Sequence, residues 1–198
     1  MTPSEFALVR SVFGKPAWQI KWDHQVGLRL DFGAPYLHVR EPREVDTPKK
    51  RVRALFKRLV TLRGSHYLWI APEAWRLVLS DGRVVRRFSS ARASDRACAQ
   101  LRGEALIGLS IDTASGTTTF RFDLGGRIDA IPPRGWGHEP DDELWSLWVP
   151  RNRFVAVYAG GYFGVGRTTG PDPTPRPFQA KGVVGIGRFA RRRTRGAA

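Results

Sequence analysis

The chain has 198 residues, of which 41% are hydrophobic and 11% aromatic, and its formal net charge is +15. This length and composition predict one large or two small globular domains with a sizeable core. No apolar run reaches the ~20 residues that span a bilayer, and no charged leader with an apolar stretch opens the chain. Cys98 is the single cysteine, which excludes an internal disulfide and most zinc sites. We therefore expect a cytoplasmic protein without metal or cofactor.

The positive charge is distributed unevenly. Residues 1–102 hold 20 basic and 9 acidic side chains, residues 103–166 hold 5 and 8, and residues 167–198 hold 8 and 1. This asymmetry favours acidic proteins or polyanions as partners. Alternatively, Arg outnumbers Lys 27 to 6, a bias that a GC-rich genome produces without selection for binding. Composition alone leaves both interpretations open.

Residues 17–23 and 28–33 are the first predicted strands, because apolar and polar residues alternate in both. Asp23 and His24 lie between them. Adjacent strand residues point to opposite faces, so a tight turn is expected here rather than a catalytic pair. The tryptophans that keep a strand rhythm are expected in the core: Trp18, Trp22, Trp75 and Trp145.

A basic amphipathic helix is predicted over residues 48–63. Thr47 suits the N-cap, Pro48 suits the first helical position, and Gly64 ends the pattern. The apolar side holds Val52, Leu55, Phe56, Leu59 and Val60, and the opposite side holds Lys50, Arg51, Arg53, Lys57 and Arg58. Because like charges repel at this spacing, the positive side suggests an anionic partner or an acidic neighbour such as the 139–143 loop; a solvated face is the alternative.

Residues 73–79 are the next predicted strand, followed by a second helix over about 94–102. Ala97, Cys98 and Leu101 share one side of this helix. Gly103 ends it, and we place a boundary there.

Three segments of the first half recur in the same order in the second half: 17–23 matches 106–112, 28–33 matches 120–125, and 73–79 matches 143–149. Asp, Gly and Asn between the segments indicate hairpin turns. We therefore predict an α+β, mostly antiparallel β fold of two tandem diverged β-meander repeats packed together, with one amphipathic helix inserted in each or between them. The expected units are 1–102, 103–166 and a tail over 167–198.

The loop 132–142 holds Arg134 and Trp136. Trp and Arg dominate interface hot spots, so both are candidate partner-binding residues, and folding of Trp136 over the core is the alternative. The acids of 139–143 are adjacent rather than spaced, which favours a solvated loop over a cation site. The Gly-rich stretches 160–166 and 182–187 precede no helical pattern, so they indicate turns and strand irregularities rather than phosphate loops.

The tail begins with a Pro-rich linker at 170–177 and continues with a small apolar patch around Ile186. We interpret it as a flexible segment able to dock one extra strand. Its basic candidates for partner binding are Arg191, Arg192 and Arg193.

The run WDHQVGLRL over residues 22–30 resembles the DHQV-x-L-x-L opening of an uncharacterised family of small, mainly actinobacterial proteins. The F-x-F-D-x-G hairpin at 120–125 and the W-x-L strand at 143–147 belong to the same pattern. The resemblance covers residues 14–160, and the basic 48–63 segment and the tail depart from it. The family has no established activity. Its size and variability are similar to those of immunity proteins of toxin systems, an analogy only.

No catalytic signature such as G-x-S-x-G or H-E-x-x-H is present. The first hypothesis is a non-enzymatic protein-binding module, immunity-type or regulatory, with a protein partner of acidic character. The alternative is a sequence-nonspecific nucleic-acid-binding protein that uses the 49–63 segment and the Arg-rich 188–195 segment. The sequence leaves the oligomeric state open.

Overall fold

The computed structural model describes residues 1–42, 56–137, 142–169, 173–179 and 182–187. Its helices are α1 (Pro3–Arg10) and α3 (Ala91–Leu101). The strands in chain order are β1 (Ala17–Asp23), β2 (Gly27–Arg40), β3 (Leu59–Ile70), β4 (Trp75–Val78), β5 (Val84–Arg86), β6 (Leu106–Asp112), β7 (Thr118–Phe122), β8 (Arg127–Ala130), β9 (Glu143–Val149), β10 (Arg153–Tyr158), β11 (Tyr162–Arg167), β12 (Arg176–Pro177) and β13 (Val183–Gly187).

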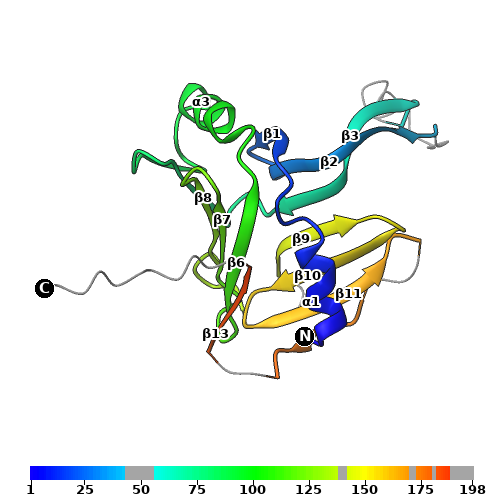
Figure 1. Ribbon diagram of the computed structural model, residues 1–198, viewed down its shortest axis with the longest axis vertical. Helices are drawn as coiled ribbons and strands as arrows, with labels where there is room; N and C mark the ends of the chain where they lie inside the picture. The colour runs from blue at the N-terminus through cyan, green and yellow to red at the C-terminus, as the bar shows by residue number, and fades with distance from the viewer. Residues whose placement is uncertain (43–55, 138–141, 170–172, 180–181, 188–198) are drawn as a thin grey trace, which may run out of the picture.

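The strands form two sheets. One has the order β1-β2-β3-β9-β10-β11-β12, and the other has the order β13-β6-β7-β8-β4-β5. All the pairings between these strands are antiparallel, which confirms the predicted mostly antiparallel β class. Figure 1 shows the sheet of β6, β7 and β8 beside the sheet of β9, β10 and β11. Each sheet takes strands from both sides of residue 103, so the expected boundary does not separate the sheets.

The β4–β5 hairpin of the first half pairs with a strand of the second half, and the β9–β10 hairpin of the second half pairs with a strand of the first. The edge of β3 bonds to β9, with Ile70 opposite Trp145, and the edge of β8 bonds to β4, with Ala130 opposite Trp75. The expectation that each half completes its own meander is therefore wrong. Alternation along a strand determines which side chains face the core, but it does not determine which strand lies alongside.

One hydrophobic core lies between the sheets. Phe120 of one sheet meets Trp145 of the other edge to face, with ring centroids 5.3 Å apart, and the indole of Trp145 donates to Thr118 Oγ1 at 2.8 Å. Trp75 is buried as expected, and so is Trp145. Trp22 is only partly buried against the core, and Trp18 lies half-buried with its indole donating to the carbonyl of Gly33.

Helix α3 buries Ala97, Cys98 and Leu101, the residues expected on its inner side. Within the described residues, no helix has the length and apolar character needed to cross a membrane. Helix α1 was not expected. A capping box starts it, in which Glu5 N–H donates to Thr2 Oγ1 while the Glu5 carboxylate accepts from Thr2 N–H.

The predicted helix over 48–63 is wrong where it can be compared with the structure. Residues 59–63 belong to β3, where Leu59 and Val60 pair with Arg40 and Val39. Cross-strand pairing with β2 therefore overrides the helical spacing of the apolar residues. Thr47, Pro48 and the rest of the predicted helix before residue 56 lie outside the described residues.

The tail region contributes two strands rather than one. Strand β12 pairs with β11, and β13 pairs with β6 and buries Ile186.

Candidate functional site

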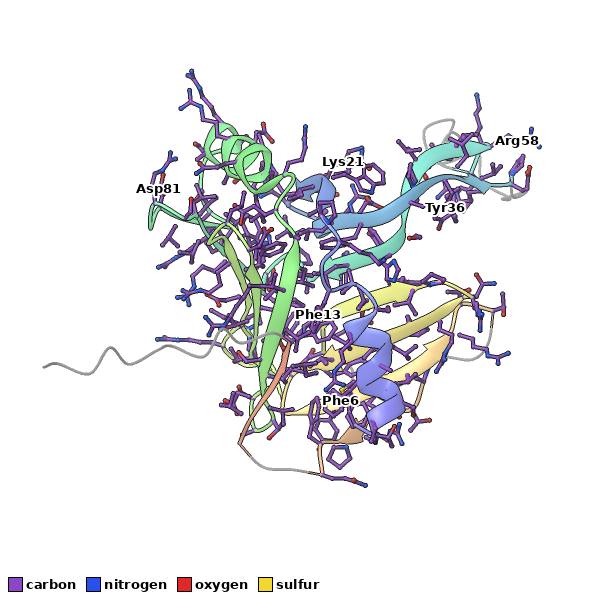
Figure 2. The ribbon with its side chains drawn as sticks, in the orientation of Figure 1. Phe6, Phe13, Lys21, Tyr36, Arg58 and Asp81 are labelled. Carbon is purple, nitrogen blue, oxygen red and sulfur yellow. The ribbon has the colours of Figure 1, made fainter. Side chains whose placement is uncertain are left out.

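The longest strands form a protruding arm. We give this name to residues 35–40 of β2 and 59–64 of β3, whose register runs from Pro35 opposite Gly64 to Arg40 opposite Leu59. Figure 1 shows the β2–β3 hairpin extending away from the rest of the fold, and Figure 2 labels Tyr36 and Arg58 on this part. Within the described residues the arm is a ribbon of two strands.

One face of the arm continues the core-facing side of the sheet. On β3 this side runs outward from the buried Ile70 and Leu68 and ends at Leu62 and Val60. Directly opposite lie Leu37, paired with Leu62, and Val39, paired with Val60. These four aliphatic side chains are 46% to 66% exposed. The arm therefore carries an exposed apolar face, which we define by Leu37, Val39, Val60 and Leu62.

A bulge keeps the two strands of the apolar face in phase. Phe32 lies opposite His66 and Pro35 lies opposite Gly64, so β2 uses one residue more than β3 across this step. Gly33, in the bulge, has φ +71, and a Cβ there would come 2.4 Å from Ser65 Oγ. Without the extra residue, Leu37 and Val39 would turn to the opposite side of the ribbon.

Buried polar groups fix the base of the arm. Asp31 accepts a hydrogen bond from Gly64 N–H at 2.8 Å, and burial raises the pKa of its carboxyl. His66 contacts Ser11 Oγ through Nε2 and Ser65 Oγ through Nδ1, both at 3.1 Å. Burial, with a smaller effect of the nearby Lys15 charge, lowers the pKa of His66 to about 4. This imidazole is therefore neutral at physiological pH.

The other face of the arm holds its basic and polar residues. It presents Tyr36 opposite Arg63, His38 opposite Thr61, and Arg40 opposite the exposed Leu59. The Arg63 guanidinium lies over the Tyr67 ring at 4.5 Å from its centroid. At the outer end, Arg58 pairs with Glu41 at 2.8 Å, and both side chains are more than 60% exposed. The arm is thus amphipathic, with apolar and basic sides back to back.

The predicted partner-binding residues are distributed as follows. Lys57 and Arg58 precede β3 at the outer end of the arm, and both are exposed. Arg134 is exposed in the loop after β8, which belongs to the other sheet, and Trp136 in the same loop packs partly buried against the core. The remaining candidates lie outside the described residues: Lys50, Arg51, Arg53, Arg191, Arg192 and Arg193.

The apolar face was missed because its β3 half, Val60 and Leu62, lies within the range assigned to a helix. Val60 fits helical spacing together with Leu59 and residues before 57. The signal that could have found the strand is the alternation from Val60 through Leu62 to Leu68 and Ile70.

Asp23 and His24, the adjacent acid and base of the sequence, lie at the turn between β1 and β2. Asp23 forms a turn, as expected: its Oδ1 accepts from the backbone N–H groups of Gln25 at 2.7 Å and Val26 at 3.1 Å, and these bonds lower its pKa. His24 packs against the Trp22 ring. Among the described residues, no group of three or more His, Cys, Asp or Glu side chains is placed to hold a metal ion.

No protein-family model matches the chain, and no curated protein or solved structure matches it either. The resemblance to the DHQV family stays a prediction.

Proposed function

We propose that this chain is a non-enzymatic protein-binding module whose arm is the contact element. The observation that carries the proposal is the apolar face of Leu37, Val39, Val60 and Leu62. Folded monomers rarely leave contiguous apolar patches on a projecting element, and such patches mark interaction surfaces. Four aliphatic side chains on one side of a ribbon offer a partner burial of about 1 kcal/mol or more each.

The charges around the apolar face favour an acidic partner. Lys57 and Arg58 precede β3 at the outer end of the arm, where Glu41 pairs with Arg58, Arg63 lies on the basic side of the arm, and the whole chain carries +15. A second copy would bring equal positive charge to the contact, which opposes association. A partner with an apolar groove flanked by acidic side chains would contact the apolar face through the groove and the basic residues of the arm through its acids.

The test is affinity capture from the native cell with three forms of the chain: the natural chain, the double variant Leu37→Ser/Leu62→Ser, and Leu124→Ser. Leu124 is 69% exposed in the β7–β8 turn, so it matches the exposure of Leu37 without touching the arm. We expect acidic proteins to be retained by the natural chain and by Leu124→Ser but lost from the double variant, with or without nuclease. The same proteins on all three forms would refute the proposal.

A second candidate function is nonspecific nucleic-acid binding, favoured by the basic side of the arm and the Arg-rich tail. Its contacts would be to phosphates, so its affinity would fall steeply with salt. Arg63→Gln would then weaken binding to generic DNA or RNA, while Leu37→Ser/Leu62→Ser would not. No binding at ~50 mM salt would exclude this function.

We also propose that the two halves are diverged copies that exchange their final hairpins. Trp75 pairs with Ala130, and Trp145 pairs with Ile70. If Trp75 corresponds to Trp145, then Ala130 corresponds to Ile70, and every other residue pair of β4–β8 corresponds to a pair of β9–β3. The neighbouring pairings make Phe120 equivalent to Leu30, two residues from the match suggested by sequence. Residues 1–102 and 103–198, co-expressed as separate chains, should copurify because each sheet needs both. Halves that fold separately would contradict the exchange.

A further inference from the structure

A cleft of about 380 Å³ lies between β1 and α3, on a part of the fold separate from the arm. Figure 1 shows α3 beside β1, and Figure 2 labels Lys21 next to this helix. Three cationic side chains line the cleft: Lys21 from β1, Arg29 from β2, and Arg102 just beyond the end of α3. Its volume is at the lower end of the range for small-molecule sites.

The three cations outnumber the carboxylates that line the cleft, Asp23 and Asp95. Lys21 and Arg29 lie directly opposite each other across the β1–β2 pair, an arrangement that is destabilising for like charges. Within the described residues, no salt bridge involves Lys21, Arg29 or Arg102. The Nε of Arg29 is buried and has no hydrogen-bond partner among these residues. A buried donor of this kind calls for a missing acceptor.

The two carboxylates of the cleft already have donors. Asp23 accepts from the backbone N–H groups of its own turn, and Asp95 accepts from the Trp22 indole N–H at 2.8 Å. Asp23 and Asp31 attract Arg29 electrostatically without a salt bridge to it, and Asp31 also attracts Lys21. Cations therefore outnumber acids in the cleft by three to two, and Ile20 and Trp22 supply an apolar wall.

We propose that this cleft binds a small organic anion. A carboxylate or phosphate head would accept hydrogen bonds from Lys21, Arg29 and Arg102, and the body of the ligand would pack against Ile20 and Trp22. Charge-assisted bonds from guanidinium groups are the interactions that proteins use for such heads. This site is independent of the arm, so it stands or fails separately from the proposed protein binding.

The experiment is a titration of the full chain followed through the Trp22 indole ¹H–¹⁵N resonance, assigned with Trp22→Phe. The probes are phenyl phosphate and benzoate, which distinguish the two head groups, with benzyl alcohol as the neutral control. We expect a saturable shift with at least one anion and none with the alcohol. Lys21→Gln and Arg102→Gln, both at exposed positions, should each weaken binding roughly tenfold.

Arg96→Gln is the matched control, because it removes the same charge from an exposed position of α3 that does not line the cleft. Its affinity should equal that of the natural chain. If Arg96→Gln lost as much affinity for the anion as Lys21→Gln and Arg102→Gln, the anion would be attracted by the net charge only, and the proposed site would be overturned. The absence of a saturable shift with both anions, or an equal shift with benzyl alcohol, would also overturn it.

Discussion

Two identical substitutions on one strand test whether the apolar face of the arm is uncovered in solution. Leu68 and Leu62 are both on β3 and on the same side of it, but Leu68 is fully buried in the core whereas Leu62 is 47% exposed on the arm. Leu68→Ala removes buried methyl groups and leaves a cavity, which costs about 2–5 kcal/mol of unfolding free energy. Leu62→Ala loses only about half of the transfer free energy of a leucine, about 1 kcal/mol, and leaves no cavity.

The assay is urea unfolding followed by circular dichroism. Both variants should keep the slope of the natural chain, so that the shift in midpoint reports stability. We expect a large midpoint shift for Leu68→Ala and a small one for Leu62→Ala. The comparison is internal to one strand, which removes differences in strand propensity between the two sites.

A cost for Leu62→Ala as large as that for Leu68→Ala would refute the reasoning. It would mean that the face is packed in the free protein, either by another copy or by another part of the chain. Repeating the measurement at several protein concentrations separates these cases, because only association between copies makes stability depend on concentration.

Three further predictions concern the core. The pKa of His66 is about 4 in the folded chain and 6.5 in the unfolded chain, so between these pH values the unfolded chain binds one proton more. The free energy of unfolding should therefore fall by up to about 3 kcal/mol as the pH drops from 6.5 to 4. In His66→Gln the urea midpoint should change less with pH over this range. Trp145→Phe should cost about 1–3 kcal/mol beyond its packing loss because it removes a buried hydrogen bond. Trp148→Phe removes only a part-buried hydrogen bond to Ser146 from a side chain that is 36% exposed, so it should cost less than about 1 kcal/mol in the same assay. Burial raises the pKa of Cys98 to about 12, so iodoacetamide should label it at neutral pH only after unfolding; rapid labelling of the native chain would contradict this.

The sequence was informative where local pattern determines local structure. The predicted strands 17–23, 106–112 and 143–149 have the same bounds as β1, β6 and β9. Apolar residues at every second position of these segments allow one face to be buried, and flanking turn residues mark the ends. The same reasoning located the inner side of α3.

The errors arose where a distant segment decides the outcome. Residues 59–63 fit a helical pattern, but β2 offers them a complete set of backbone partners over the length of the arm. The exchange of hairpins between the halves is also nonlocal, because β4 and β9 have similar patterns and either could follow its own meander. Helix α1 was also missed despite a local signal, the Thr2–Pro3–Glu5 combination at its start.

The bulge at Gly33 bears directly on what the arm is for. A ribbon that only had to be solvated would be stable with polar residues on both sides, and one extra residue in β2 would serve no purpose. Here that residue aligns Leu37 and Val39 with Leu62 and Val60, so that all four make one surface. Such a surface invites pairing with other copies, and the positive charge that the ribbon carries opposes it. An apolar face protected in this way admits a partner of opposite charge more readily than a second copy.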